Sequence, residues 1–298
     1  MTEIKTRIHF DDQIRRNKIK SILLIVIVFA VLISLSYVIG LIYRDSFFFI
    51  LILGIIISIF YTLISYYNSD KIALFSVGAK PADYNYYRQY HHLVEGICLA
   101  SGMPKPKLYV MENEQINAFA TGRNPQNSVI CVTTGSLNKL NKQELEGVIS
   151  HELSHIANYD IRFMTLTAVL VGMIAIISEL FLRSLFHRGG NSGRNGKGNA
   201  ILLIVGIVLA ILAPIIVQLV QFAISRKREF VADASAVKFT RSPTGLINAL
   251  KKIKNDSNKM KVSGAVAPLF ISNPAKKLSG LFQTHPPIEQ RIEVLSRM

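Results

Sequence analysis

Two long segments without a charged residue limit what this chain can fold into. Residues 21–43 carry no charge over 23 positions, and residues 46–69 carry none over 24. At a rise of about 1.5 Å per residue, each segment is long enough as a helix to cross a hydrocarbon layer of about 30 Å. Only Arg44 and Asp45 separate them. We therefore predict a tight transmembrane hairpin over residues 21–69.

A second pair of apolar segments is less regular. Residues 163–178 and 200–225 are uncharged, and Glu179 follows the first of them at an expected membrane interface. The Gly-rich loop at residues 183–199 holds four basic residues, whereas loops outside the cell are usually poor in Lys and Arg. We expect residues 163–225 to form a second transmembrane hairpin. Packing on the soluble part, or dipping into one leaflet, is the alternative.

The polar lead at residues 1–20 sets the expected orientation. It carries six Lys and Arg residues, so the positive-inside rule places it in the cytoplasm. The first apolar segment is too long for a cleavable signal peptide, and no small-residue cleavage site follows it. Two crossings return the chain to the cytoplasm at Lys71. We therefore predict a multi-pass protein with both termini and the soluble segments 71–162 and 226–298 in the cytoplasm.

The net charge of +15 is compatible with nucleic acid, anionic lipid or an acidic substrate. Basic residues flank the apolar segments, as at residues 14–20 and 226–228, which favours anionic lipid headgroups. Aromatic and basic residues do not alternate as nucleic-acid binding would require, so we expect no nucleic acid. Neither Cys98 nor Cys131 belongs to a Cys-x-x-Cys pair, which predicts buried thiols in a reducing compartment.

The soluble segments predict a mainly helical α+β domain with a small sheet. Asn141 and Glu144 have the spacing of a capping box at the start of a helix that ends near Ala157. Helices are expected over residues 81–101 and 141–157, from Ser242 and from His285, and strands over residues 107–111, 118–121 and 128–133.

The helix from Asn141 carries His151-Glu152-Leu153-Ser154-His155. A spacing of four residues places both imidazoles on one face, where they can bind one Zn²⁺ at about 2.0–2.1 Å. Glu152 lies about 100° around the helix and can reach a metal-bound water without binding the metal. Two surface histidines on an amphipathic helix are the alternative. We predict a zinc site with His151 and His155 as ligands and Glu152 as the general base.

A catalytic zinc site needs a third protein ligand and an open fourth position. Glu229 is the best candidate, ahead of other carboxylates and His285, because Asp233 lies four residues further along the same helical face. Asp233 can accept the second N–H of a ligating histidine. An exposed ion pair of Glu229 with Arg226 or Lys227 is equally compatible with the spacing.

Four motifs occur in an order typical of one known family. They are His-Glu-Leu-Ser-His-Ile-Ala-Asn-Tyr-Asp at 151–160, Ser-Arg-Lys-Arg-Glu-Phe-Val-Ala-Asp at 225–233, Asn-Ala-Phe-Ala-Thr-Gly at 117–122, and Thr-His-Pro-Pro at 284–287 followed by Arg291. With the second apolar pair between the zinc motifs, the chain resembles the HtpX family of bacterial membrane zinc metalloproteases over nearly its whole length. The type I CAAX prenyl endopeptidases are more distant relatives.

This resemblance implies a gluzincin-like fold with one Zn²⁺ per chain, Glu229 as the third ligand and Asp233 orienting His151. It implies that His285 stabilises the oxyanion and that Arg291 holds His285 in place. A helix N-cap and a surface charge are the alternatives that the residues alone favour for these two. The resemblance also implies quality control of membrane proteins in a prokaryotic cell membrane.

The expected reaction is hydrolysis of a peptide bond. Zinc would lower the pKa of a bound water, and Glu152 would take its proton and pass it to the leaving amine. An extended substrate is expected to add one more strand to an edge strand, although an ordinary turn at Asn117 is equally compatible with the sequence. The predicted substrate-binding residues are Asn117, Ala118, Phe119 and Ala120.

The zinc motifs lie next to the second apolar pair. His155 is eight residues before that pair, about 12 Å along a continuous helix, and Glu229 is four residues after it. We therefore expect the metal near the cytoplasmic membrane surface, with membrane proteins, or peptides that reach this surface, as substrates.

Three other classes of protein are less compatible with the sequence. An intramembrane protease needs its histidine motif in a spanning helix, but residues 143–159 are too polar to span. A transporter or channel would need charges inside several spans, and only Glu179 qualifies. A non-catalytic zinc-binding membrane scaffold would not need Glu152, and this is the alternative that we retain.

Overall fold

A computed structural model of the chain describes part of the sequence in detail. The predicted second hairpin lies outside the described residues from position 170 onward, as do Glu179 and the loop at residues 183–199, so this hairpin stays a prediction. The described residues are 10–42, 44–169, 226–258, 260, 262, 266–272 and 285–298.

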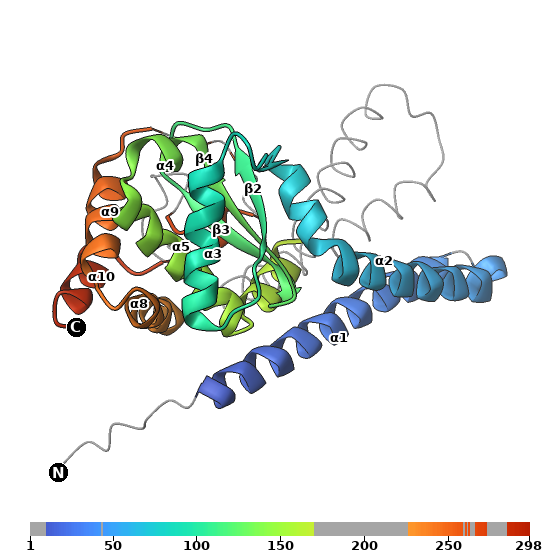
Figure 1. Cartoon of the computed structure of the whole chain (residues 1–298). Coiled ribbons are helices and arrows are strands. Elements are labelled where there is room, and N and C mark those ends of the chain that lie inside the picture. The colour runs from blue at the N-terminus through green and yellow to red at the C-terminus, as the bar shows by residue number, and fades with distance from the viewer. Residues whose placement is uncertain are drawn as a thin grey trace, which may run out of the picture.

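Two long helices carry the apolar sequence at the N-terminal end of the chain. They are α1 (Phe10–Ile42) and α2 (Phe47–Ser76), joined by the 3-10 turn η1 (Arg44–Ser46). Ile14–Ser34 and Phe47–Ser76 are long and apolar enough to cross a membrane, and only 6% of the most apolar part of α2 is buried. Figure 1 shows α1 and α2 side by side, with the end at which they join extending away from the soluble domain. Apolar surface left uncovered by protein is what a membrane helix requires.

Small residues let α1 and α2 approach closely. A Cβ atom at Gly54 would lie 2.0 Å from the Ser36 hydroxyl oxygen, so no larger residue fits there without displacing it. The Tyr37 and Phe47 rings meet edge to face at 5.6 Å near the turn. The close approach of the helices at Gly54 and Ser36 is typical of helices that pack inside membranes.

A small mixed sheet forms the first part of the soluble domain. The strand order is β1-β2-β4-β3, in which β2 and β4 are parallel and the other pairs antiparallel. Among the described strands, the one that begins at Ala118 lies at an edge of the sheet, as predicted. The strands are β1 (Lys80–Pro81), β2 (Lys107–Met111), β3 (Ala118–Asn124) and β4 (Asn127–Thr133).

The helix α5 (Lys142–Ala157) is the centre of the soluble domain, with the other helices around it (Figure 1). Its capping box is confirmed, because the Asn141 side chain accepts from the Glu144 amide at 2.9 Å and the Glu144 carboxylate accepts from the Asn141 amide at 2.8 Å. The remaining described elements are α3 (Arg88–Ser101), α4 (Thr134–Lys139), a helix over residues 160–169, α8 (Arg226–Thr240), α9 (Thr244–Asn255), η2 (Ala267–Leu269) and α10 (Ile288–Leu295).

One predicted helix is shorter than expected. The helix predicted over residues 81–101 begins at Arg88. Pro81 pairs with Tyr109 as part of β1, and the Asp83 carboxylate accepts from the amides of Asn85 and Tyr86 at 2.9 and 3.1 Å. This side-chain turn competes with helix formation, because an aspartate that binds nearby amides stabilises a turn instead.

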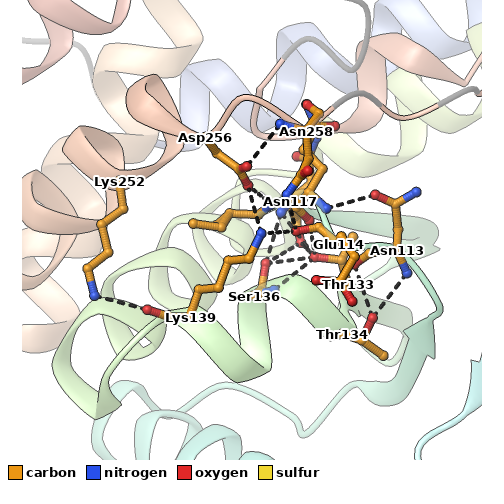
Figure 2. Close-up of polar contacts among 12 residues, drawn as sticks. Asn113, Glu114, Asn117, Thr133, Thr134, Ser136, Lys139, Lys252, Asp256 and Asn258 are labelled. Carbon is orange, nitrogen blue, oxygen red and sulfur yellow. Dashed lines mark hydrogen bonds and ion pairs between the residues drawn. The ribbon is translucent and has the colours of Figure 1, made fainter.

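A polar network fixes the chain where it enters β3 (Figure 2). The hydroxyls of Thr133 and Ser136 both accept from the Asn117 amide, at 3.1 and 2.9 Å. The Asp256 carboxylate, just after α9, accepts from the Ile116 amide at 2.7 Å. Because these groups come from β4, α4 and the end of α9, the start of β3 is held on three sides.

We predict that Gly147→Ala lowers stability, because α5 and α9 touch at this residue. A Cβ atom at Gly147 would lie 2.5 Å from the Leu246 backbone nitrogen, so α9 would have to move. The expected cost is about 1–3 kcal/mol, measured as a lower melting temperature in detergent. Gly96→Ala on α3 is the control, because a Cβ there meets nothing within 4 Å. It should be neutral or stabilising by up to about 1 kcal/mol, and equal melting of both variants would contradict the prediction.

Candidate metal centre

Two histidines of α5 and one glutamate of α8 converge inside the soluble domain. The ligand atoms of His151, His155 and Glu229 all lie within 4.8 Å of one another. The two Nε2 atoms are 3.2 Å apart, and each is 3.5 Å from a Glu229 oxygen. Ligands at about 2.0–2.1 Å from a tetrahedral ion are about 3.3 Å apart, so these separations suit one metal ion. Glu229 is 4% exposed, and the alternative of an exposed ion pair is therefore wrong.

Each of the two histidines has a carboxylate within hydrogen-bond distance of its Nδ1 atom. Asp233 lies 2.9 Å from His151 Nδ1, and Asp160 lies 3.1 Å from His155 Nδ1. If both Nδ1 atoms donate to these carboxylates, both Nε2 atoms present lone pairs to the same point, which favours a cation between them. The structure places Asp233 where the resemblance implied. Asp160 was missed, although an acid directly after the helix that carries His155 was a usable signal.

A sharp turn brings Asp160 back toward His155. The helix α5 ends at Ala157, Tyr159 has a left-handed φ of 58°, and a new helix covers residues 160–169. A left-handed conformation costs a residue with a side chain about 1–2 kcal/mol. The continuous helix considered from the sequence is therefore wrong, and the break is what turns the Asp160 carboxylate to the imidazole.

The guanidinium of Arg291 binds Asp233 from the far side. Its Nε and Nη2 donate to the two Asp233 oxygens at 2.8 and 2.6 Å, and the residue is 1% exposed. The alternative of a surface charge is therefore wrong. Burial would raise the pKa of Asp233, but Arg291 and His151 outweigh it and lower that pKa. The shortest hydrogen bonds of Arg291 thus hold Asp233, the partner of His151, whereas the resemblance had implied that Arg291 holds His285.

The centre holds an excess of negative charge. Burial and Arg291 lower the pKa of His151, but hydrogen bonds with Asp233 and Glu229 outweigh them and raise it to about 9. Burial would raise the pKa of Glu229, yet His285 and His151 hold it well below its usual range. A metal ion binds histidines in their neutral form, and then the described buried carboxylates around the centre exceed the described buried guanidiniums there by two, which suits a divalent cation. These groups are Glu152, Asp160, Glu229 and Asp233 against Arg228 and Arg291.

Glu152 lies beside the two histidines without belonging to the ligand group. It is 1% exposed, and among the described residues its Oε1 has no hydrogen-bond partner. Burial raises its pKa, while the Ala120 backbone amide and both histidines act against the rise. A buried carboxylate oxygen without a partner is costly, and a bound metal with its water would compensate for it.

His285 completes the group from the loop before α10. Its Nε2 lies 3.6 Å from a Glu229 oxygen, and burial lowers its pKa to about 4. It is therefore neutral near pH 7 and can still donate one N–H. The N-cap of α10 is Pro287, so the alternative of His285 as an N-cap is wrong.

The segment of predicted substrate-binding residues forms the outer edge of β3. Asn117 is fully buried, and its side chain bonds to both the amide and the carbonyl of Ser272, at 3.3 and 3.1 Å. The Ile271 amide donates to the Ala118 carbonyl at 2.9 Å, and Phe119 forms a bridge with Phe270. The chain after η2 thus covers the first two residues of this edge.

Two histidines and a glutamate around one point, with a buried carboxylate beside them, define a single-metal hydrolase site. Residues 86–298 match Peptidase family M48, so the chain belongs to this family of metallopeptidases. With the apolar helices α1 and α2, it is a membrane metalloprotease.

Curated relatives agree with this assignment. A protease HtpX homolog of Caldanaerobacter subterraneus subsp. tengcongensis is 49% identical over 244 residues, which cover 80% of this chain and 82% of that protein. One from Listeria monocytogenes serotype 4a is 42% identical over 301 residues, covering 96% and 99%. The resemblance to the HtpX family is therefore confirmed. The crystal structure of S. mikatae Ste24p is similar with a TM-score of 0.45 at 18% identity, covering 95% of this chain and 66% of that one.

We predict that Arg291→Met destabilises the protein strongly, because it leaves the Asp233 carboxylate buried without its cation. Breaking a buried ion pair from one side costs about 3–5 kcal/mol, measured by thermal or urea unfolding in detergent. Arg297→Met is the matched control. Its side chain is 73% exposed and pairs with Glu293 on the surface, so we expect a change below about 0.5 kcal/mol. Similar losses for both variants would show that the buried pair has no special weight.

Proposed function

We propose that this metalloprotease is a zinc endopeptidase of the gluzincin type that hydrolyses membrane proteins at the cytoplasmic face of a prokaryotic cell membrane. The observation that carries the proposal is the convergence of His151, His155 and Glu229 beside the buried carboxylate of Glu152. The observed separations between the ligand atoms suit Zn²⁺, which favours two histidines and one carboxylate with an open position in catalytic sites.

The residues of the centre divide into binding and proton-transfer roles. His151, His155 and Glu229 would hold the ion, which supplies Lewis-acid activation of a water and of the peptide carbonyl. Glu152 accepts the proton of the attacking water at its unpartnered oxygen and passes it to the leaving nitrogen. His285 donates its N–H to the oxygen that becomes negative, because burial keeps this imidazole neutral with one proton to donate.

We propose that an extended substrate pairs with the outer edge of β3. The Ala120 amide lies on this edge and contacts Glu152, so a strand added here passes the general base. The chain at Phe270–Ser272 already covers Ala118 and Phe119, and it must move for pairing to extend to Asn117.

The place of the centre relative to α1 supports membrane substrates. Asn17 of α1 contacts Asp160, which contacts His155, and Asn17 lies within the apolar segment Ile14–Ser34. The uncharged part of α1 begins at Ser21, only about 6 Å further along the helix. A metal this close to the start of a membrane helix can act on chains that emerge from the bilayer. Quality control of membrane proteins is consistent with this position.

We predict that Glu152→Gln abolishes proteolysis but keeps the metal. Loss of a general base costs about 10²–10⁴-fold in rate, whereas the ligand set is unchanged. His155→Ala and Glu229→Ala should lose both zinc and cleavage, and chelation of the wild type should match them. The measurement is cleavage of a model membrane protein together with zinc analysis of each purified variant. Unchanged cleavage by Glu152→Gln would refute its role as the general base, whereas unchanged biological activity of this variant without cleavage would favour the non-catalytic zinc-binding scaffold.

We also propose that both termini and the soluble domain are cytoplasmic, with the basic part of α1 at anionic lipid headgroups. The side chains of Arg15, Arg16, Lys18 and Lys20 are exposed around the buried Asn17. Basic side chains at this point of a membrane helix favour the anionic cytoplasmic leaflet.

Cysteine labelling tests this orientation. Cys98 and Cys131 are both free and buried, so replacing them by Ala gives a background without thiols. Ser296→Cys near the C-terminus should react with an impermeant maleimide in inside-out vesicles but not in intact cells. Asp45→Cys, in the exposed turn between α1 and α2, should show the opposite pattern. Labelling of Ser296→Cys in intact cells would refute a cytoplasmic catalytic domain.

A further inference from the structure

A chain of hydrogen bonds links the membrane helix α1 to the metal centre. Asn17 Nδ2 donates to Asp160 Oδ1 at 2.7 Å, and Asp160 Oδ2 lies 3.1 Å from His155 Nδ1. Asn17 is 2% exposed and Asp160 is fully buried. The second acceptor of the Asn17 amide is the Asn158 carbonyl, at 3.0 Å. One amide of α1 therefore holds both the carboxylate behind His155 and the carbonyl at the end of α5.

Asp160 Oδ1 is the carboxylate oxygen that does not face His155. Its shortest described contact is the hydrogen bond from Asn17 Nδ2. The nearest described cation is Arg228, whose Nη1 is 3.6 Å from that oxygen, too long for a good hydrogen bond. A buried carboxylate takes the orientation that its donors fix. Without the Asn17 amide, the Asp160 carboxylate could turn away from the imidazole.

The whole turn that aims Asp160 rests on α1. The ammonium of Lys18 lies 4.5 Å from the centre of the Tyr159 ring, at the residue with the left-handed backbone. Asn17 and Lys18 together contact all three residues of the turn, Asn158, Tyr159 and Asp160. Anchoring in a bilayer needs apolar side chains, so it does not account for a buried amide at this position.

We propose that Asn17 is a positioning residue of the metal centre, which acts by holding Asp160 against His155. This inference rests on the proposed binding of zinc by His151, His155 and Glu229. It makes α1 part of the centre as well as a membrane anchor. Some carboxylates hydrogen-bond to a ligating histidine. Mutating such a carboxylate, or a group that holds it, typically weakens metal binding by about 10–100-fold.

The test measures zinc affinity of the full-length protein in detergent by competition with a chromophoric chelator. We expect Asn17→Ala to raise the zinc Kd about tenfold and to alter the visible spectrum of the cobalt-substituted protein, because the His155 ring is less well oriented. Ser21→Ala is the matched control. Ser21 is also buried on α1, but its hydroxyl donates to the Asn17 carbonyl of the same helix, so Kd and spectrum should match the wild type.

Two further variants distinguish positioning from a general loss of structure. Asp160→Asn should weaken zinc binding by itself, and Asn17→Ala should add little to it, because both act through one carboxylate. If Asn17→Ala does not fold, Asn17→Ser replaces it. Its shorter hydroxyl cannot reach both acceptors, so a several-fold rise of Kd is expected.

Failure of the proposed role of Asn17 can be distinguished from failure of the proposed zinc site. Zinc affinity and cobalt spectra of the Asn17 variants equal to those of Ser21→Ala, or losses that add fully with Asp160→Asn, would overturn the role of Asn17. A wild-type protein that binds no zinc would instead overturn the proposed metal centre.

Discussion

Negative charge buried beside two imidazoles is the constraint on which the rest of the structure depends. Glu152, Asp160, Glu229 and Asp233 lie in the interior, where a carboxylate is stable only beside cations or hydrogen-bond donors. The elements around α5 supply these groups: Arg291 comes from the C-terminal helix, and the amide of Asn17 comes from the N-terminal one. Elements that are distant in the sequence are thus connected through their contacts with the buried carboxylates. The same excess of negative charge is what gives the centre its affinity for a cation.

Membrane attachment and the hydrolytic centre are one structure in the described part of this protein. The apolar residues Leu24 and Val28 of α1 pack with Phe163 and Leu166, which follow Asp160 in the next helix. The C-terminal end of α2 also packs on the soluble domain, where Ala73 and Leu74 are buried in a cluster with residues of β3 and β4. Because the candidate membrane spans themselves pack on the catalytic domain, the distance between these spans and the centre is fixed by packing and does not depend on a linker.

Features that rest on local sequence were predictable, and those that rest on distant contacts were not. The cap at Asn141 and the positions of His151, Glu152 and His155 depend on residues within one helix, and the structure reproduces their spacing. Spacing alone could not decide between Glu229 as a ligand and as a surface acid, because that depends on how α8 packs on α5. Asp160 was missed because a left-handed Tyr159 turns it back, and Asn17 carried no signal. The start of α3 was misplaced because Asp83 forms a turn that competes with the helix.

The two edges of the sheet have different properties. On the side of β2, the sheet ends at a strand of two residues, and Pro81 has no amide hydrogen to offer a further chain. On the side of β3, we propose that the backbone beside Glu152 pairs with the substrate. Among the described strands, β3 is thus the edge that offers more backbone for pairing. If substrates pair with β3 as we propose, this asymmetry favours the addition of a strand at the edge beside Glu152 over addition at the opposite edge.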